Sequence, residues 1–393
     1  MTKEEKISQL NKVFSPFSPV EEKNLFQGRI QQLEKIVDTI NEEGQHCILY
    51  GERGVGKTSL SNIMMKSFTA IHAVKVTCNR EDTFFTLWRQ SLKAIQFSTN
   101  NKGIGFKPQD SHSIINLWQQ FSDRETLNPS DIVDFFKKIS HIKIMFIFDE
   151  FDNVHDDKTR KEFADLIKSL SDNIKNVTVI LVGIAENIES LIGDHQSLER
   201  CLRQVKMPRM SEKELSDIIR KGIVELNIAM DKSIEKRIID FASGFPHYVH
   251  LLCKYGILEL IENGRNEFSE SYLKIAIRKG IDNTGEQLKT SFRKAIHTAN
   301  SSTKWKNLIF SCANAKLDEF NSFSISNAVK EYNKLTGKKV DGSGIIYNLN
   351  KLVTDDRGAI FVKIGKGATV RYYFRNPMMR PFVKLKMNSE EIL

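Results

Sequence analysis

The chain has 393 residues, 40% of them hydrophobic, and this length predicts two or three globular domains. The longest apolar run is far shorter than the roughly 20 residues of a membrane-spanning helix, and the N-terminus is polar, so we expect a cytoplasmic protein with no membrane partner or signal peptide. Its five cysteines are scattered and contain no C-x-x-C pair. We therefore expect neither a zinc site nor a disulfide framework. Of the net charge of +9, +8 falls in residues 303–393, where 16 Lys and Arg accompany 8 Asp and Glu; this favours a module that binds a polyanion, the alternative being a solvated surface.

Predicted strands and helices alternate in the N-terminal half of the sequence. After a polar leader, a helix is expected just past Gly28, within residues 24–44. Strands are then predicted at 47–50, 73–78, 142–152 and 177–187, helices at 59–64, 83–95, about 113–121 and 128–139, and a loop at 98–109. This alternation predicts an α/β fold with a mostly parallel, doubly wound sheet.

A phosphate-binding loop is predicted between the first strand and the helix that follows it. Residues 51–58 satisfy the pattern G-x-x-x-x-G-K-[ST], in which backbone N–H groups surround the phosphates of a nucleotide. In such a loop Lys57 reaches the β- and γ-phosphates, and the Thr58 hydroxyl is a ligand of Mg²⁺. The residues assigned to this cradle are Gly51, Glu52, Arg53, Gly54, Val55, Gly56, Lys57, Thr58 and Ser59.

Two acidic residues, Asp149 and Glu150, end the most apolar of the predicted strands. An open α/β sheet binds its ligands at the carboxyl ends of its strands. One carboxylate there can hold Mg²⁺ while the next polarises an attacking water. We therefore assign Asp149 to the metal and Glu150 to the general base; an acidic turn without function is the alternative, which the phosphate loop disfavours.

The pattern becomes helical after residue 210. Helices are predicted at 211–227 and 233–244, then at 304–316, 324–335 and 343–353, with two strands at 359–365 and 369–375. In the helix at 343–353, one face should lie in the core, and it comprises Ile345, Ile346, Leu349, Leu352 and Val353. The opposite face should point outward, and it comprises Tyr347, Asn348, Asn350 and Lys351.

These motifs, in this order, resemble those of AAA+ ATPases, in the branch that joins origin-recognition ATPases to STAND signalling ATPases. Phe26-Gln27-Gly28-Arg29 resembles the F-x-G-R box that lines the adenine pocket in that family, residues 51–58 resemble Walker A, and Asp149-Glu150 resembles the end of Walker B. The resemblance spans roughly residues 24–252 and continues more weakly to the end. It implies a P-loop ATPase that binds ATP and Mg²⁺, with a leader at 1–23, a core at 24–209, a helical lid at 210–300 and a winged helix at 301–393.

The family resemblance also implies residues that sense the nucleotide. A polar sensor is expected after the fourth strand, and Asn187 is favoured over Glu186 because an amide can donate to a phosphate oxygen. An arginine finger is expected at Arg200, or at Arg203 one helical turn further on, and would complete the site of a neighbouring subunit in a homo-oligomer; surface arginines are the alternative. His247 occupies a position where many AAA+ lids have arginine, so it either contacts phosphate or caps a helix.

Residues 303–386 resemble a winged helix-turn-helix. Tyr347, Asn348, Asn350 and Lys351 would then suit a groove of double-stranded DNA, and the wing residues Lys363, Lys366, Arg371 and Arg375 would suit its phosphates. In many STAND proteins, however, such a domain only packs as a regulatory latch or contacts a protein.

The leading hypothesis is an ATP-hydrolysing switch that couples its nucleotide state to oligomerisation and DNA engagement. Replication initiators, transposition regulators and anti-phage defence ATPases belong to this group. The alternative is a signalling scaffold that hydrolyses ATP slowly and recruits a protein effector. A metabolic kinase is disfavoured because a helical lid and a winged domain have no role in phosphorylating a small molecule.

Overall fold

The computed structural model describes residues 2–19, 28–68, 70–101, 111–184, 198–297 and 302–391. The chain forms two compact units, one of residues 19–208 and one that combines residues 1–18 with residues 209–393. We call them the sheet unit and the helical unit. Within the described residues, no helix is long and apolar enough to cross a membrane.

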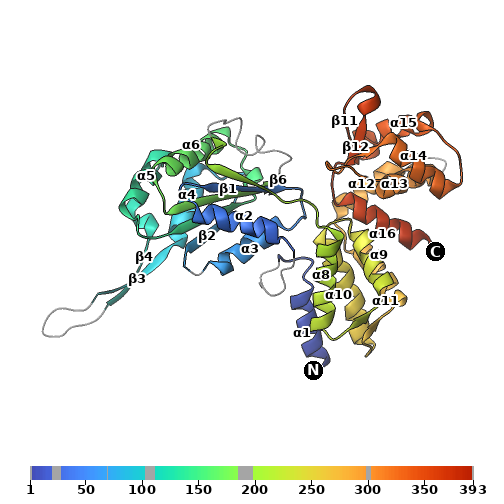
Figure 1. The fold of residues 1–393 in the computed structure, drawn as a ribbon, viewed down its shortest axis with the longest axis horizontal. Coiled ribbons are helices and arrows are strands. Elements are labelled where there is room, and N and C mark those ends of the chain that lie inside the picture. The colour runs from blue at the N-terminus through green and yellow to red at the C-terminus, as the bar shows by residue number, and fades with distance from the viewer. Residues whose placement is uncertain are drawn as a thin grey trace. The chain divides into compact units, whose positions relative to one another are not determined.

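The sheet unit contains a parallel five-stranded sheet in the order β2-β5-β6-β1-β7, which confirms the predicted fold class (Figure 1). Its strands are β1 (His46–Gly51), β2 (His72–Thr77), β5 (Ile144–Asp149), β6 (Val177–Ile184) and β7 (Leu202–Lys206). Every residue of β5 is buried, as expected for a parallel strand that is covered on both faces. Because all five strands run in one direction, the phosphate loop after β1 and the acidic pair after β5 lie at the same edge of the sheet.

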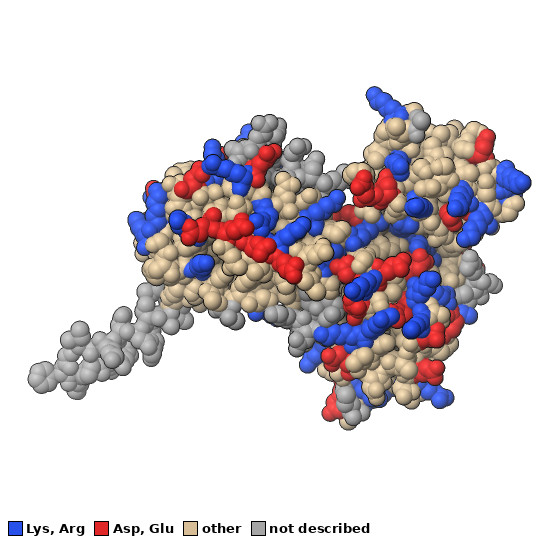
Figure 2. Space-filling view, in the orientation of Figure 1, with Lys and Arg blue, Asp and Glu red and all other residues tan. Residues whose placement is uncertain are grey.

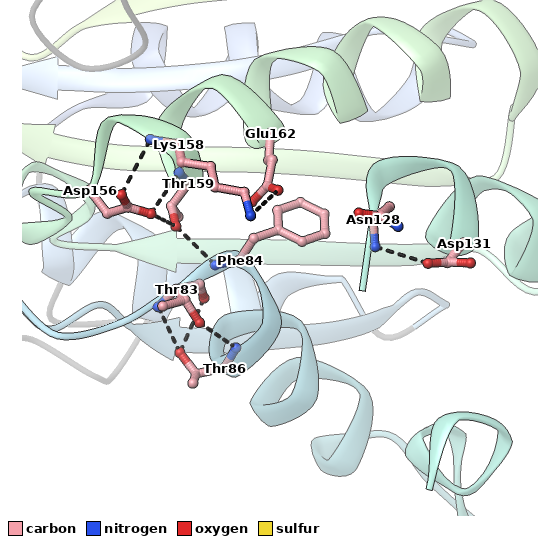
Figure 3. Close-up of polar contacts among 9 residues, drawn as sticks. All are labelled: Thr83, Phe84, Thr86, Asn128, Asp131, Asp156, Lys158, Thr159 and Glu162. Carbon is pink, nitrogen blue, oxygen red and sulfur yellow. Dashed lines mark hydrogen bonds and ion pairs between the residues drawn. The ribbon is translucent and has the colours of Figure 1, made fainter. Parts of the chain in front are cut away.

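Helices pack on the faces of this sheet, and their first residues carry local caps. The helices are α2 (Ile30–Asn41), α3 (Lys57–Ser67), α4 (Phe84–Ala94), α5 (Pro129–Lys138) and α6 (Asp157–Asn173), with the 3₁₀ turns η1 (Leu117–Phe121) and η2 (Phe151–Asn153). Figure 3 shows the caps of α4, α5 and α6, where Thr83 and Thr86 bond reciprocally and Asp156 accepts the backbone N–H of Thr159. The Thr159 hydroxyl also accepts the backbone N–H of Phe84, 3.1 Å away, and so joins the first turns of α4 and α6.

A β-hairpin replaces part of the loop and helix that the sequence predicts at 98–121. Strands β3 (Gln96–Asn101) and β4 (Ser111–Asn116) pair antiparallel, and only η1 follows as a helical turn. The predicted loop is therefore wrong for residues 98–101, and the predicted helix is wrong for 113–116. Backbone pairing between the two strands decides this structure, and their polar sequences carry little apolar periodicity that would reveal it.

The part of the helical unit that the sequence predicts as a lid, and that we call the lid, is a bundle that includes the N-terminal segment. Its helices are α1 (Lys3–Val13), α8 (Glu212–Glu225), α9 (Lys232–Ala242), α10 (Pro246–Glu262), α11 (Glu270–Asp282) and α12 (Glu286–Ile296), and the short strands β8 (Ala229–Met230) and β9 (Glu267–Phe268) pair parallel. Helix α1 contacts α10 and buries Leu10 and Val13. The polar leader of the sequence thus contains a helix that belongs to the helical unit.

Residues 303–391, which we call the C-terminal subdomain, complete the helical unit. They form α13 (Thr303–Asn314), β10 (Phe323–Ser324), α14 (Ile325–Thr336), α15 (Gly342–Lys351), β11 (Phe361–Ile364), β12 (Arg371–Phe374) and α16 (Met379–Glu391), with the 3₁₀ turns η4 (Asp355–Arg357) and η5 (Gly367–Thr369). The three strands pair antiparallel in the order β10-β12-β11. Helix α16 contacts α9 and α11 of the lid as well as α13, so the lid and the C-terminal subdomain share one core.

Candidate nucleotide-binding site

The phosphate loop joins β1 to α3 through a left-handed turn. Gly56 has a φ of +95° and directly precedes the first residue of α3, Lys57. Residues other than glycine rarely adopt this conformation. The loop therefore brings the N-terminus of α3, with its unpaired N–H groups and partial positive charge, to the carboxyl edge of the sheet.

Lys57 lies within the loop and is 9% exposed. Its Nζ donates to the carbonyl oxygens of Gly51 and Glu52, each 2.9 Å away. Burial lowers the pKa of Lys57 to about 8, although the nearby carboxylate of Asp152, and then that of Asp149, act to raise it. Among the described residues, this buried ammonium donates to loop carbonyls alone, and it is a suitable donor for a phosphate group.

The acidic pair after β5 places its two carboxylates in different environments. Asp149 is 2% exposed; its Oδ2 lies 2.8 Å from Nζ of Lys75, and its Oδ1 accepts the backbone N–H of Glu150 at 3.0 Å. Glu150 is exposed and has a φ of +56°, which is uncommon outside glycine and asparagine. The structure therefore holds Asp149 in place and leaves Glu150 exposed to solvent at the turn.

Two further residues, which sequence reasoning missed, hold this acidic turn in place. Asn153 donates from Nδ2 to Oε2 of Glu150 at 3.2 Å and to the carbonyl of Cys78, after β2, at 3.3 Å. Asp152 accepts the backbone N–H of Ile184, the last residue of β6, at 2.8 Å. The motif D-E-F-D-N contains both residues, but only the pairing of β5 with its neighbours reveals their partners.

The donor atoms at this edge suit Mg²⁺. In the described part of the chain, no three His, Cys, Asp or Glu side chains gather as a metal-binding group. What the loop and strand offer is the Asp149 carboxylate and the half-buried Thr58 hydroxyl. Mg²⁺ prefers oxygen ligands and commonly takes one or two from protein while the rest come from water and nucleotide phosphates, so these residues fit the ion.

The predicted adenine-pocket box is described only in part, since Phe26 lies outside the described residues. Arg29 is 2% exposed and donates from Nη2 to the carbonyl oxygens of Val55, at 2.9 Å, and Pro208, at 2.6 Å. It thus connects the phosphate loop to the segment that follows β7. Within the loop, Val55 is fully buried and Arg53 is exposed.

The two candidate finger arginines do not lie on one helix, which corrects that expectation. Arg203 lies in β7, where it pairs in register with Cys47 of β1, and its Nη2 is 2.8 Å from a carboxylate oxygen of Glu42. Arg200 precedes the strand; its side chain is 73% exposed and pairs with Asp172 at 2.7 Å. Parallel pairing with β1 replaces the helix expected here. The sensor candidates Glu186 and Asn187 lie outside the described residues.

His247 contacts the N-terminal segment, and the expectation that it caps a helix is wrong. The N-cap of α10 is Phe245, and Nδ1 of His247 lies 2.8 Å from the carbonyl oxygen of Pro16. Because a carbonyl only accepts, Nδ1 carries the proton in this contact. Burial lowers the pKa of His247, while the Pro16 carbonyl acts to raise it.

The outward face of α15 differs from the predicted one at two positions. Ile345, Asn348 and Leu349 are buried, whereas Ile346 is 39% exposed and Tyr347 is 63% exposed. The predictions of a core position for Ile346 and an outward position for Asn348 are therefore wrong. Asn348 follows Ile345 by three residues, so it falls on the same buried face of the helix.

The residues predicted to form a wing are partly engaged within the C-terminal subdomain. Oδ1 of Asn350 accepts from Lys363 at 3.1 Å and from the Tyr372 hydroxyl at 2.9 Å, and Arg371 pairs with Asp318 at 3.0 Å. Lys351 lies over the Tyr347 ring, 4.7 Å from its centroid, and Lys366 is exposed. On the face in view in Figure 2, the basic side chains of this subdomain are interspersed with acidic ones.

A phosphate loop after β1, an acidic pair at the end of β5, and β6 between these two strands in the sheet form the core of a P-loop NTPase. Residues 13–299 match the family model described as Novel STAND NTPase 1, and the chain belongs to that family. The matched segment ends before the C-terminal subdomain begins.

Three similar solved structures were compared with the chain, and the first of them, with a TM-score above 0.5, supports the fold. A Walker-type ATPase of Pyrococcus abyssi is 14% identical, with 95% of this chain and 99% of that chain covered and a TM-score of 0.54. The ORC2 protein of Aeropyrum pernix, in ADPNP and ADP complexes, is 13% identical over 97% of this chain and 98% of its own, with a TM-score of 0.49. The ORC1 protein of Aeropyrum pernix, in complex with DNA, is 14% identical over 97% of this chain and 98% of its own, with a TM-score of 0.48. Among curated proteins, no sequence matches significantly.

Proposed function

We propose that this protein binds ATP with Mg²⁺ and hydrolyses it to ADP and phosphate. The observation that carries the proposal is the position of a buried lysine, Lys57, in a loop at the sheet edge where the Asp149-Glu150 pair ends β5. A simple βα turn would leave this ammonium without a polyanion to bind and would not require an acidic pair at the same edge.

Each residue has a role that its environment supports. Lys57 would exchange the Gly51 and Glu52 carbonyls for phosphate oxygens of the nucleotide. Thr58 and Asp149 would hold Mg²⁺, which stabilises negative charge on the phosphates. Glu150, exposed and oriented by Asn153, would accept a proton from the attacking water.

Turnover and binding measured on the same variants test this proposal. Glu150→Gln should lower the rate of ATP hydrolysis by about 10²-fold or more and leave the binding of a fluorescent ATP analogue intact, whereas Lys57→Ala should lose binding. Glu125→Gln removes an exposed carboxylate of the same unit and serves as the matched control. Normal turnover in Glu150→Gln would show that another group is the base.

We propose further that the nucleotide state controls self-association and that the C-terminal subdomain engages double-stranded DNA. Its element order, helix, strand, two helices and two strands, supports a winged helix-turn-helix. Residues 303–393 carry a net charge of +8, and Tyr347, Lys351 and Lys366 offer exposed groups. Replication, transposition or defence would each use such a switch.

The salt dependence of DNA binding tests the second proposal. Lys351→Glu and Lys366→Glu should each weaken binding. Each should also make the slope of log affinity against log salt concentration shallower by about one, the change expected for the loss of one phosphate contact. Lys304→Glu makes the same charge change at an exposed position of α13 and should have less effect. Size-exclusion chromatography with ATP and with ADP tests the self-association.

A protein-binding role for the C-terminal subdomain is the second candidate. It is favoured by three exposed apolar or aromatic side chains on α15 and β11, namely Ile346, Tyr347 and Ile364. A slow-hydrolysing scaffold would show no DNA binding at low salt and would lose a protein effector when Tyr347 is replaced by Ala.

A further inference from the structure

A lysine of the edge strand β2 contacts the acidic pair. Nζ of Lys75 lies 2.8 Å from Oδ2 of Asp149 and 2.7 Å from Oδ1 of Asn62. The side chain of Lys75 is 16% exposed and that of Asp149 is 3% exposed. Lys75 therefore connects the end of β5 with α3, the helix that begins at the phosphate loop.

The register of the sheet fixes this contact. Thr77 of β2 pairs with Asp149 of β5, and paired residues on neighbouring strands project their side chains to the same face. Lys75 precedes Thr77 by two residues, so its side chain projects to that face as well. Asn62 reaches the same ammonium from α3, which contacts both strands.

The charges around Asp149 give this lysine a role beyond packing. A buried carboxylate is costly unless a cation or hydrogen bonds compensate it, and Lys75 is the cation that pairs with Asp149 in the described part of the chain. Under the proposed function the same carboxylate is also a ligand of Mg²⁺. An ammonium 2.8 Å from that carboxylate competes with the ion for its oxygen and repels it.

We propose that Lys75 is a positioning residue that sets the Mg²⁺ affinity of the nucleotide site. It neutralises Asp149 and holds it against α3 while Mg²⁺ is absent, and it weakens the binding of the ion when nucleotide arrives. The inference rests on the proposed function and adds a determinant of its metal dependence. A lysine that only stabilises the edge of the sheet would affect folding without changing the response to Mg²⁺.

The test compares full-length wild type with Lys75→Met, Lys75→Arg and the control Lys175→Met, which removes a surface lysine paired with Glu43. Two quantities are measured with a fluorescent non-hydrolysable ATP analogue: the half-saturating Mg²⁺ concentration for analogue binding, and the thermal midpoint in EDTA and in Mg²⁺. Lys75→Met should lower the half-saturating Mg²⁺ concentration about tenfold. Its midpoint should be below that of wild type in EDTA and should recover more on adding Mg²⁺, because the ion then compensates the buried carboxylate.

The controls separate the possible results. Lys75→Arg retains the positive charge and should stay near wild type, as should Lys175→Met. A half-saturating Mg²⁺ concentration in Lys75→Met equal to that of wild type would overturn the inference, whatever happens to the midpoint in EDTA. If Lys75→Met does not fold, Lys75→Gln, which can still donate to Asp149 without a charge, replaces it with the same expected decrease.

Wild type alone tests the proposed function beneath this inference. If the analogue binds without any dependence on Mg²⁺, the assignment of Asp149 and Thr58 to the metal fails, and the role of Lys75 fails with it. If binding of the analogue depends on Mg²⁺ in wild type and to the same degree in Lys75→Met, only the inference about Lys75 fails.

Discussion

The ring of Phe14 fills the space beside Gly222. A Cβ added to Gly222 would lie 2.1 Å from Cζ of Phe14. Phe14 follows α1 and is fully buried, and Gly222 lies in α8. Residues 208 positions apart in the sequence thus pack so closely that only glycine leaves room for the ring. The N-terminal segment is therefore part of the core of the helical unit.

Phe14→Ala should destabilise the helical unit by about 3–5 kcal/mol, because it removes a fully buried ring and leaves a cavity. Urea denaturation followed by circular dichroism measures the loss. Val224→Ala, at a position of α8 that is 77% exposed, is the control and should change the free energy of unfolding by no more than about 0.5 kcal/mol. Equal effects in the two variants would contradict a packing role for Phe14.

His46 should make the stability of the sheet unit depend on pH. The residue is fully buried and accepts the backbone N–H of Val179 at Nδ1, 3.0 Å away, and burial lowers its pKa from 6.5 to about 4. Between these values the unfolded chain binds a proton that the folded chain does not. The free energy of unfolding should therefore fall by about 3 kcal/mol as the pH drops from 6.5 to 4.

Denaturant titrations at several pH values between 7 and 4 measure this contribution. His46→Asn should lose it and show a shallower dependence on pH, whereas His141→Asn, at an exposed position, should retain the wild-type dependence. A His46→Asn profile parallel to that of wild type would rule out His46 as the source.

Arg200 and Arg203 should respond differently to replacement by alanine. Arg203 bonds to both carboxylate oxygens of Glu42, at 2.8 and 2.9 Å, and is 29% exposed, so Arg203→Ala should cost about 1 kcal/mol of stability. Arg200 is the better candidate for a finger because its side chain is more exposed than that of Arg203. As a finger that acts on a neighbouring subunit, it should give an Arg200→Ala variant whose ATP turnover is about 10³-fold lower. ATP turnover measured against protein concentration distinguishes a finger from a stabilising ion pair. A loss of turnover in Arg203→Ala but not in Arg200→Ala would reverse the assignment.

Lys384→Met should loosen the lid from the C-terminal subdomain. Lys384 lies in α16 and Asp240 in α9. Nζ of Lys384 donates to Oδ1 of Asp240, at 2.6 Å, and to the Asp240 carbonyl oxygen, at 3.1 Å. Losing both bonds should cost about 1–3 kcal/mol. Hydrogen exchange measured by mass spectrometry should quicken in α9 and α16, while Lys304→Met, at an exposed position of α13, should leave both helices unchanged.

The phosphate loop and the apolar strand β5 could be predicted from sequence because their signals are local. A glycine-lysine spacing and an uninterrupted apolar run are each specified by a few consecutive residues. The position of α15 and most of its buried face, with Ile345, Leu349 and Leu352, could also be predicted. Ile346 and Asn348 exchange sides because the buried stripe is rotated by less than one residue from the assumed helical phase.

Features that depend on distant partners could not be predicted in this way. Strand β7 carries polar residues at most of its positions, and its pairing with β1 makes it a strand. The contact between Lys75 and Asp149 follows from the register of β2 against β5. Helix α1 appears polar in the sequence, and its burial of Leu10 and Val13 depends on packing with α10, which lies far along the chain.

The shared core around α16 has a mechanical consequence. Helix α16 contacts α9 and α11 as well as α13, so a displacement of the lid helices would act directly on a helix of the C-terminal subdomain. When a rigid arm rotates, displacement grows with distance from the axis. A small rotation of the lid would therefore sweep the exposed residues of α15 and β11 through a larger arc.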